Sequence, residues 1–323
     1  MFDRRTLIAI AIFFSIFLGL NAVGGYRLPF VPAIVLYLFI YFLVSRLYAS
    51  PASVEAFRSQ QQEWPTSGPI GRYGQKGLIL VFTITGMLGL LNPFLLIQII
   101  RQGLGNSILK LTVRLNGDKF ESYESELKYS LPFEGNWFVY NGGTQPSNSH
   151  SWDVITQRYA YDFVIADENR IRHTSSGTQL NDYFCYDKNI CAAAAGKVVK
   201  VVDGIKPAPF VGYGIADFAC RNFVGNHIII EHTANEYGLY AHLINGSIGV
   251  REGEVVSRGQ FVGKCGHSGY SSEPHLHFHL QNKKDFYMAV GLPITFSSIR
   301  IDENLKQNVR IQAGQFVMNG DSL

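Results

Sequence analysis

The pattern of apolar and polar positions divides the chain into two unlike parts. Three segments carry no charged residue: residues 6–26, 28–45 and 77–100. Each is long enough for an α-helix to cross the hydrocarbon core of a bilayer. Buried core helices would give the same pattern, and so would a signal peptide for the first segment. A signal peptide needs a small-residue cleavage site, and no clear A-x-A site comes directly after the first segment. We therefore predict three membrane helices within residues 1–104.

Residues 105–323 alternate between apolar and polar positions over short stretches bounded by Gly, Asn and Ser, which is typical of β-strands. A polar loop, residues 144–157, interrupts them, and the tail after residue 297 adds two strand-like pieces. No long amphipathic helix pattern appears. The fold class expected is a mainly β outer domain, an antiparallel sheet or sandwich with long loops, after the three-helix region. The strands are expected within 108–115, 126–133, 135–143, 158–166, 194–204, 225–233, 236–243 and 247–263.

Composition and charge place the outer domain relative to the membrane. Only 16% of the 323 residues are charged, against about 25% in an average soluble protein. The net charge of +3 is too small to indicate a nucleic-acid partner. Lys and Arg are enriched before the first segment and between the second and third, which predicts that both stretches are cytoplasmic. The outer domain should then lie outside the cytoplasmic membrane, in the periplasm, although Arg101 directly after the third segment argues against this orientation.

All four cysteines lie in the outer domain, where oxidising conditions allow disulfides. Cys185 and Cys191 are close in sequence and would be the first pair to form, with four buried thiols as the equal alternative. Because no C-x-x-C motif occurs, a cysteine zinc site is not expected.

The stretch EPHLHFHL, residues 273–280, places three histidines at alternate positions. Along a strand, His275, His277 and His279 share one face, while the apolar residues between them share the other. Neighbouring imidazoles on that face would be roughly 6.5 to 7 Å apart. They could hold a metal ion, or one could bind the metal while the next moves protons. The alternative is three solvated histidines on an exposed face.

Several motifs together resemble the lysostaphin/LytM-type zinc endopeptidases. The motifs are GQFVGKCGHSGYSSEPHLHFHL (259–280), YAHL (240–243), AAAAGKVVKVVDG (192–204) and YDF (161–163). The resemblance covers about residues 133–300 in order. It implies a β-sheet groove, one zinc ion and cleavage of peptide bonds in bacterial cell-wall peptidoglycan.

The resemblance also implies roles for individual residues. Asp162 and His277 would be zinc ligands, His275 the catalytic base, and His242 the second catalytic histidine. A catalytic zinc takes three protein ligands and leaves one position for water, whose pKa it lowers to about 7. The base then accepts a proton, and a second group steadies the developing charge.

One position departs from the family pattern. The usual H-x-x-x-D motif would put a histidine at 158, where this chain has Arg158, a side chain that stays protonated and cannot bind zinc. We expect His150, in the polar loop before the strand, to replace it. Some relatives carry such a loop histidine ahead of a Q-R-Y-A-x-D strand. His173 is the fallback ligand.

The remaining histidines receive simpler interpretations. His227 and His232 are expected to pack or face solvent, His267 to lie in a solvated turn, and His279 to support His277 from outside the ligand set.

Three functions remain open at this level. The first is a membrane-anchored zinc endopeptidase acting on peptidoglycan stem peptides or cross-links. The second is a LytM-like module without zinc that binds the cell wall and activates another hydrolase. The third is a metal sensor, which would leave His242 and His275 without a role. Three helices exceed what anchoring in the lipid bilayer requires, which leaves room for a membrane-protein partner.

Overall fold

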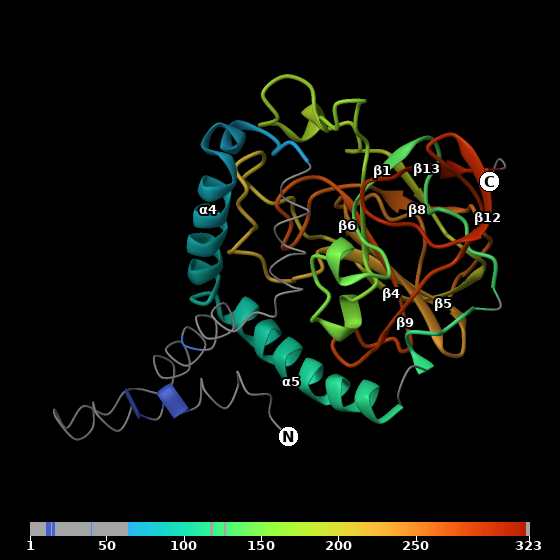
Figure 1. Ribbon diagram of the computed structural model, residues 1–323, viewed down its shortest axis with the longest axis horizontal. Helices are drawn as coiled ribbons and strands as arrows, with labels where there is room; N and C mark the ends of the chain where they lie inside the picture. Colours follow the sequence, from blue (N-terminus) through green and yellow to red (C-terminus); the bar gives the residue numbers. More distant parts are fainter. Residues whose placement is uncertain are drawn as a thin grey trace. The chain divides into compact units, whose positions relative to one another are not determined.

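One long antiparallel sheet organises the strand-rich part of the chain (Figure 1). The computed structural model describes residues 11–13, 15–16, 40, 64–116, 119–125 and 127–320. The predicted helices over 6–26 and 28–45 therefore lie almost entirely outside the described residues. The chain divides into two units, Met1–Val54 and Glu55–Leu323, and the sheet belongs to the second.

The sheet runs in the order β12-β11-β13-β1-β2-β9-β6-β5-β4-β7, with β10 beside β9, and a second sheet pairs β3 with β8. Every strand pair is antiparallel, so the predicted mainly antiparallel β domain is confirmed. The strands are β1 Trp137–Asn141, β2 Tyr161–Val164, β3 Asn189–Cys191, β4 Gly196–Val202, β5 Asn226–Thr233, β6 Glu236–Leu243, β7 Val255–Val256, β8 Phe261–Lys264, β9 Leu276–Gln281, β10 Gly291–Leu292, β11 Phe296–Ile301, β12 Asn304–Val309 and β13 Phe316–Asn319.

Two predicted strands are wrong. Residues 108–115 belong to helix α5, Pro93–Asn116, and the described residues 127–133 pair only through isolated bridges at Tyr129 and Phe133. The sequence ILKLTVRL fits both periods, because Leu109 and Val113 are four residues apart and pack on one side against Ile155. The tail holds three strands, β11 to β13, where two pieces were expected.

The uncharged segment 77–100 is not one helix. It is divided between α4, Gly74–Gly89, and α5, which meet at a bend of 100°. Pro93 begins α5, because proline fits the first turn of a helix but disfavours helical backbone at the residue before it. Asn92 caps the new helix by accepting the Phe94 N–H at 3.0 Å. Among the described helices none is long and apolar enough alone to cross a membrane, whereas α4 and α5 meet that criterion as a bent pair.

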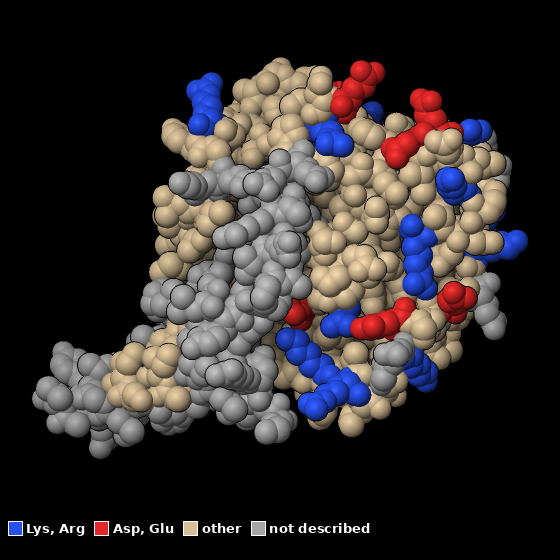
Figure 2. All heavy atoms as spheres, viewed as in Figure 1, with Lys and Arg blue, Asp and Glu red and all other residues tan. Residues whose placement is uncertain are grey.

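Charged side chains of both signs are interspersed over the strand-rich part of the face shown in Figure 2. Short 3-10 turns complete the described fold: η1 Pro69–Tyr73, η3 Pro146–Asn148, η4 Ile155–Gln157 and η5 Leu180–Asp182.

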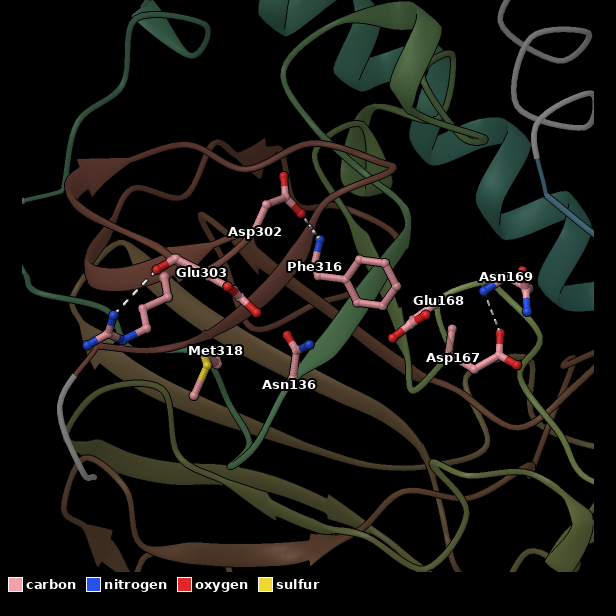
Figure 3. Close-up of a pocket in the computed structure, with 10 residues that line it drawn as sticks. Asn136, Asp167, Glu168, Asn169, Asp302, Glu303, Phe316 and Met318 are labelled. Atoms are coloured by element: carbon pink, nitrogen blue, oxygen red, sulfur yellow. Dashed lines mark hydrogen bonds between the residues drawn. The ribbon is translucent and has the colours of Figure 1, made fainter.

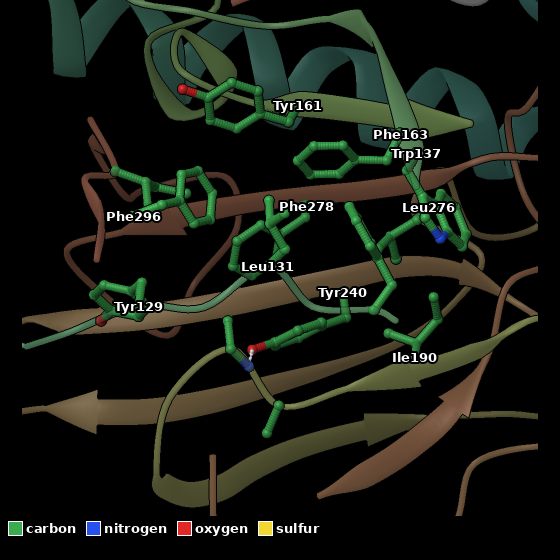
Figure 4. Packing of buried hydrophobic residues seen from close by; sticks show 14 of the residues in the cluster. Tyr129, Leu131, Trp137, Tyr161, Phe163, Ile190, Tyr240, Leu276, Phe278 and Phe296 are labelled. Atoms are coloured by element: carbon green, nitrogen blue, oxygen red, sulfur yellow. Dashed lines mark hydrogen bonds between the residues drawn. The ribbon is translucent and has the colours of Figure 1, made fainter. Parts of the chain in front are cut away.

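The two faces of the sheet bury different groups. Large aromatic and aliphatic side chains from β1, β2, β6 and β9, together with the 129–133 segment, form the main core on one face (Figure 4). Tyr240 and Phe278 pair across β6 and β9 with ring centroids 4.8 Å apart. Burying each such side chain contributes about 1.5–3 kcal/mol. The apolar residues of the histidine strand, Leu276, Phe278 and Leu280, belong to this core, so the three histidines cannot.

All four cysteines are buried free thiols. A Cys185–Cys191 disulfide was therefore the wrong alternative, and the four-thiol interpretation describes the structure. Cys185 and Cys265 belong to the main core, where the Cys185 thiol donates to the Pro274 carbonyl at 3.2 Å. Burial raises the pKa of Cys191 to about 11 and of Cys220 to about 12, so both are protonated thiols at neutral pH.

Candidate metal centre

Strand pairing places Asp162 and His277 side by side. Asp162 on β2 lies directly opposite His277 on β9, and His277 lies opposite Ala241 on β6. The His277 Nδ1 atom is 2.9 Å from Asp162 Oδ1. On the other side of β2, Asn141 donates from Nδ2 to Asp162 Oδ2 at 2.9 Å. The Asp162 side chain is 9% exposed, and these two contacts fix the orientation of both carboxylate oxygens.

A distorted backbone brings the ring of His242 close to those of His275 and His277. Residues alternate along β6, so His242 would be expected on the core face with Tyr240. Its φ of 61° lies in the left-handed region, which a non-glycine residue seldom adopts, and the distortion breaks the alternation. The His242 ring centroid lies 4.7 Å from that of His275 and 5.9 Å from that of His277. Ligand atoms of these three histidines lie within 4.8 Å of one another.

Hydrogen bonds define the tautomers of His242 and His275. The Nδ1 of His242 is 2.8 Å from the Ser268 carbonyl oxygen, and the Nδ1 of His275 is 2.8 Å from the Glu273 carbonyl oxygen. A carbonyl oxygen only accepts, so Nδ1 carries the proton in both rings. Each Nε2 is then unprotonated in the neutral ring. The Nε2 of His275 lies 3.6 Å from Asp162 Oδ1, at the centre of the cluster.

A second chain of hydrogen bonds defines the tautomer of His277. Gln281 donates from Nε2 to the Lys283 carbonyl at 2.7 Å, so its Oε1 faces His279 Nε2, 2.9 Å away. His279 must therefore donate from Nε2 and accept at Nδ1. The His277 Nε2 lies 3.1 Å from that Nδ1 and must carry the proton. In the neutral ring, His277 Nδ1 is then a lone pair.

This arrangement fits a metal ion. In the tautomer assigned above, a lone pair on His277 Nδ1 faces a carboxylate oxygen of Asp162 across 2.9 Å. Two acceptors in such contact need a shared cation or an added proton. Imidazole nitrogen and carboxylate oxygen are ligands that zinc takes in catalytic sites, and a supporting hydrogen bond on the other ring nitrogen is usual for such a histidine.

The loop between β1 and β2 brings His150 to the cluster. Its Nδ1 lies 3.3 Å from Asp162 Oδ2, and 38% of its side chain is exposed. His173 lies elsewhere: its Nε2 accepts the Gly68 N–H at 3.1 Å, and its Nδ1 donates to the Thr174 carbonyl at 3.1 Å. Both ring nitrogens of His173 are therefore engaged away from Asp162. The structure brings together all five predicted site residues: His150, Asp162, His242, His275 and His277.

Burial and neighbouring charge set the protonation of the cluster. Burial alone would raise the pKa of Asp162, but the neighbouring imidazoles of His150, His275 and His277 hold that pKa well below its ordinary value. Burial lowers the pKa of His150, although Asp162 opposes the shift. Burial, with His275 and His277 adding to it, holds the pKa of His242 well below its ordinary value. At neutral pH the cluster therefore contains one carboxylate, and His150 and His242 are neutral.

Arg158, at the position of the missing histidine, anchors the His150 loop. Its Nε donates to the Trp152 carbonyl at 3.2 Å, and its guanidinium carbon lies 5.1 Å from the centroid of the Trp152 ring. A further contact joins its Nη1 to Glu121 at 3.3 Å. The contacts between Arg158 and Trp152 therefore restrain the loop segment that leads into β2.

Sequence reasoning missed a buried ion pair behind His275. Arg172, 2% exposed, binds Glu273 through an Nε–Oε1 contact of 2.8 Å and lies over the ring of Tyr140 at 4.6 Å. The Glu273 carbonyl is the acceptor that orients His275. Arg172 and Glu273 are 101 residues apart, so no local pattern indicated the pair.

The other histidines follow the sequence interpretation in part. His267 is 1% exposed and lies 2.9 Å from the Ser271 hydroxyl, so the expected solvated turn was wrong. His227 is buried and donates from Nδ1 to the Gly225 carbonyl at 2.7 Å, which agrees with a packing role. His279 supports His277 by the hydrogen bond described above.

A cleft of about 740 Å³ lies apart from this cluster (Figure 3). It is bordered by Asp167 and Glu168 after β2, by Asp302 and Glu303 in the β11–β12 turn, and by Phe316 of β13. None of the five site residues lines it, so the metal centre and this cleft are separate features.

Comparison with known proteins agrees with the motifs. Residues 180–288 match the family model described as Peptidase family M23. Two curated relatives come from Vibrio cholerae serotype O1: the peptidoglycan DD-endopeptidase ShyB, 32% identical over 96 residues, and the peptidoglycan DD-endopeptidase ShyA, 40% identical over 58 residues. The matches cover 29% and 18% of this chain. They span only 21% and 13% of the relatives themselves.

Solved structures give a weaker likeness. A zinc-containing peptidase from Vibrio cholerae is 22% identical, with 51% of this chain and 39% of that chain covered and a TM-score of 0.31. The catalytic domain of lysostaphin from Staphylococcus simulans is 19% identical, with 53% and 90% covered and a TM-score of 0.27. Both TM-scores are low, so neither likeness establishes the fold. The family match and the curated relatives nevertheless confirm the resemblance that the motifs carried: residues 180–288 are similar to peptidase family M23.

Proposed function

We propose that this chain is a zinc-dependent endopeptidase that cleaves peptide bonds in peptidoglycan stem peptides or cross-links. The observation that carries the proposal is the pair of acceptors, Asp162 Oδ1 and His277 Nδ1, facing each other at 2.9 Å. The Nε2 of His275 lies 3.6 Å from an oxygen of the same carboxylate. The two Vibrio cholerae relatives named above support the substrate class.

Each of the five site residues would have a role that follows from its chemistry. His150, Asp162 and His277 would hold the zinc ion. When bound, zinc lowers the pKa of a water molecule to about 7, which makes that water a nucleophile at neutral pH. His275 presents a lone pair at Nε2 and would accept the proton of the attacking water. His242 would hold the water or polarise the scissile carbonyl. The carbonyl oxygens of Ser268 and Glu273 keep both rings turned with Nε2 toward the substrate.

The alternative, a silent module that activates another hydrolase, requires that the zinc ligands be lost. Arg158 removes one motif ligand, but His150 lies against Asp162 in its place. The convergence of the five groups favours the enzyme. The zinc content of the purified full-length chain separates the two functions, because the silent module would contain none.

Chelation provides the direct test. A chelator should abolish cleavage of purified sacculi by the full-length chain, and added zinc should restore it. His277→Ala should lose zinc, whereas His275→Ala should keep zinc while turnover falls roughly a hundredfold or more, as expected for a lost proton acceptor. Cleavage that survives chelation would contradict the metallopeptidase proposal.

The second part of the proposal concerns location. The protein would be attached to the cytoplasmic membrane with its N-terminus inside and the strand domain in the periplasm. The uncharged segments 6–26 and 28–45 support this. So does the outer surface of the bent helix pair, where many large apolar side chains are exposed: Leu80, Phe82, Ile84, Met87, Leu88, Leu91, Phe94, Ile97, Leu104, Ile108, Leu111 and Leu115.

Residues 74–116 contain four basic residues and no acidic residue, so by the positive-inside rule they argue against this orientation, as Arg101 does. A reporter that is active only outside the cytoplasm, fused after Leu323, should give signal, and a cytoplasmic reporter should not. The reverse pattern would overturn the orientation.

A further inference from the structure

Helix α5 is hydrogen-bonded to the loop that carries His150. The Asn106 side chain accepts the Ile155 N–H at Oδ1, 2.8 Å away, and donates from Nδ2 to the Asp153 carbonyl at 2.9 Å. One amide thus satisfies a donor and an acceptor of the loop backbone, which orients that segment as well as holding it. We propose that Asn106 is a positioning residue that holds the His150 loop in the geometry required for metal binding.

The packing of α5 fixes Asn106 in place. A Cβ atom at Gly105 would lie 2.1 Å from the Tyr287 carbonyl oxygen, so only glycine allows the helix to approach this closely. One turn later, Leu109 is buried against Ile155 and Val290. Asn106 lies between these two contacts. Its side chain is therefore presented by a rigid helix to a loop that has little regular structure.

His150 needs this support more than the other four site residues do. Asp162, His242 and His277 belong to strands, and His275 immediately precedes one. His150 lies in an irregular loop, and 38% of its side chain is exposed. Binding a metal must therefore order this loop, and the cost in conformational entropy weakens binding unless other contacts have already ordered it. The two bonds of Asn106, together with the Arg158 anchor, provide that order before the metal arrives.

The same helix offers a matched control. Gln98, two turns before Asn106, makes a similar bidentate contact with a different segment: its Oε1 accepts the Phe223 N–H at 2.7 Å and its Nε2 donates to the Arg221 carbonyl at 3.1 Å. The Tyr287 hydroxyl also donates to Gln98 Oε1, at 3.1 Å. None of these partners belongs to the His150 loop. Replacing Gln98 therefore removes comparable helix-to-loop bonds without releasing His150.

The test compares Asn106→Ala with Gln98→Ala in the full-length chain. Zinc affinity is measured by competition with a chromophoric chelator, and ligand geometry by the visible spectrum of the Co²⁺-substituted protein. Asn106→Ala should weaken zinc binding about tenfold to a hundredfold, the range for losing a group that orients a ligand, and should change the Co²⁺ spectrum. Gln98→Ala should leave both readouts as in the wild type. The midpoint temperature of thermal unfolding, measured without metal, should fall by similar amounts in the two variants.

Asn106→Asp gives a second variant should the alanine variant fail to fold. It keeps an acceptor for the Ile155 N–H but turns an oxygen toward the Asp153 carbonyl, so its zinc binding should also weaken. Equal zinc affinity in the Asn106 and Gln98 variants would overturn the inference.

The inference rests on the proposed zinc site, and His150→Ala separates the two. If His150→Ala binds zinc as the wild type does, the ligand assignment fails. If His150→Ala loses zinc while both Asn106 variants retain it, the site stands and the positioning role of Asn106 fails.

Discussion

Gln281 lies at the buried end of the chain of hydrogen bonds His277–His279–Gln281, and replacing it tests whether this chain sets the tautomer of a metal ligand. Gln281→Leu conserves the approximate volume of the side chain but removes the acceptor at Oε1. Without it, the Nε2–H of His279 has no partner in a site that is 0% exposed. The proton then prefers Nδ1 of His279, where it faces His277. His277 must in turn carry its own proton on Nδ1, the atom that faces Asp162.

The magnitude follows from the cost of restoring the original tautomer. Zinc binding requires a lone pair on His277 Nδ1, which returns the buried Nε2–H of His279 to a position without an acceptor. An unsatisfied buried donor costs about 1–3 kcal/mol. Zinc affinity should therefore fall about 5-fold to 150-fold. The pKa of His279 is lowered by burial, with His277 adding to the shift, to about 3, so the ring does not escape by accepting a second proton.

Gln281→Glu is the control for this variant. It removes the donor to the Lys283 carbonyl, as leucine does, but it keeps an acceptor for His279 Nε2–H. The tautomer of His277 should then be preserved, and zinc affinity should stay close to that of the wild type. Any general loosening of the 281–284 turn is common to both variants.

Two measurements on the full-length chain test whether Gln281 sets the tautomer of His277. Zinc affinity comes from competition with a chelator, and the tautomer of His277 comes from the ¹⁵N shifts of its ring in the metal-free protein. The leucine variant should move the proton from Nε2 to Nδ1, and the glutamate variant should not. If the leucine variant binds zinc as tightly as the wild type with Nδ1 still unprotonated, the tautomer argument is refuted. Equal weakening in both variants would refute it as well.

Two further predictions concern other histidines. His150→Ala should lose most of its zinc and all cleavage of sacculi. His173→Ala should keep both, because His173 forms hydrogen bonds to Gly68 and Thr174 away from the cluster. The opposite result would move the ligand assignment to His173. Burial, with Lys200 adding repulsion and the bond to Gly225 opposing, lowers the pKa of His227 to about 4 from 6.5. The unfolded state therefore binds more protons between these values, and stability falls as the pH decreases from 6.5 to 4, by about 2 kcal/mol at pH 5. His227→Gln should reduce the loss of unfolding free energy between pH 7 and pH 5 by about that amount in urea titrations; an unchanged loss would contradict it.

The sequence predicted the parts of the fold in which pattern and packing agree. Strands β1, β2, β4, β5 and β6 lie within the β-rich stretches predicted as strands, and β9 lies within the alternating stretch EPHLHFHL. Residues 108–115 failed because their apolar positions fit both a strand and a helix, and packing against Ile155 selected the helix. The Asn92–Pro93 pair indicates a helix break within segment 77–100. A prediction from hydropathy alone misses this break, because the segment carries no charge.

The site was predictable to the extent that its residues lie on motifs. Asp162 and His277 share a face and a register once β2 and β9 pair. The position of His242 was not predictable from alternation, because its φ of 61° reverses the face that its strand position implies. The buried partners of the site, Arg172 with Glu273 and His279 with Gln281, depend on contacts that exist only in the folded chain. Sequence could suggest a supporting role for His279, but not the tautomer that Gln281 imposes.

Arg158 stands where the family motif has a histidine, and its contacts support the proposal that His150 takes the place of that ligand. A histidine at 158 would precede β2 and bind the metal directly. Here, the arginine instead binds the Trp152 carbonyl and ring, six residues back along the same loop. That contact closes the segment between His150 and β2, while Asn106 holds its middle at Asp153 and Ile155. In the proposed site the third ligand lies on the loop, and the position that holds a histidine in the family motif carries one of the loop's anchors. A loop histidine has more freedom than a strand residue, so in this proposal Arg158 and Asn106 restrict His150 to the geometry that a ligand requires.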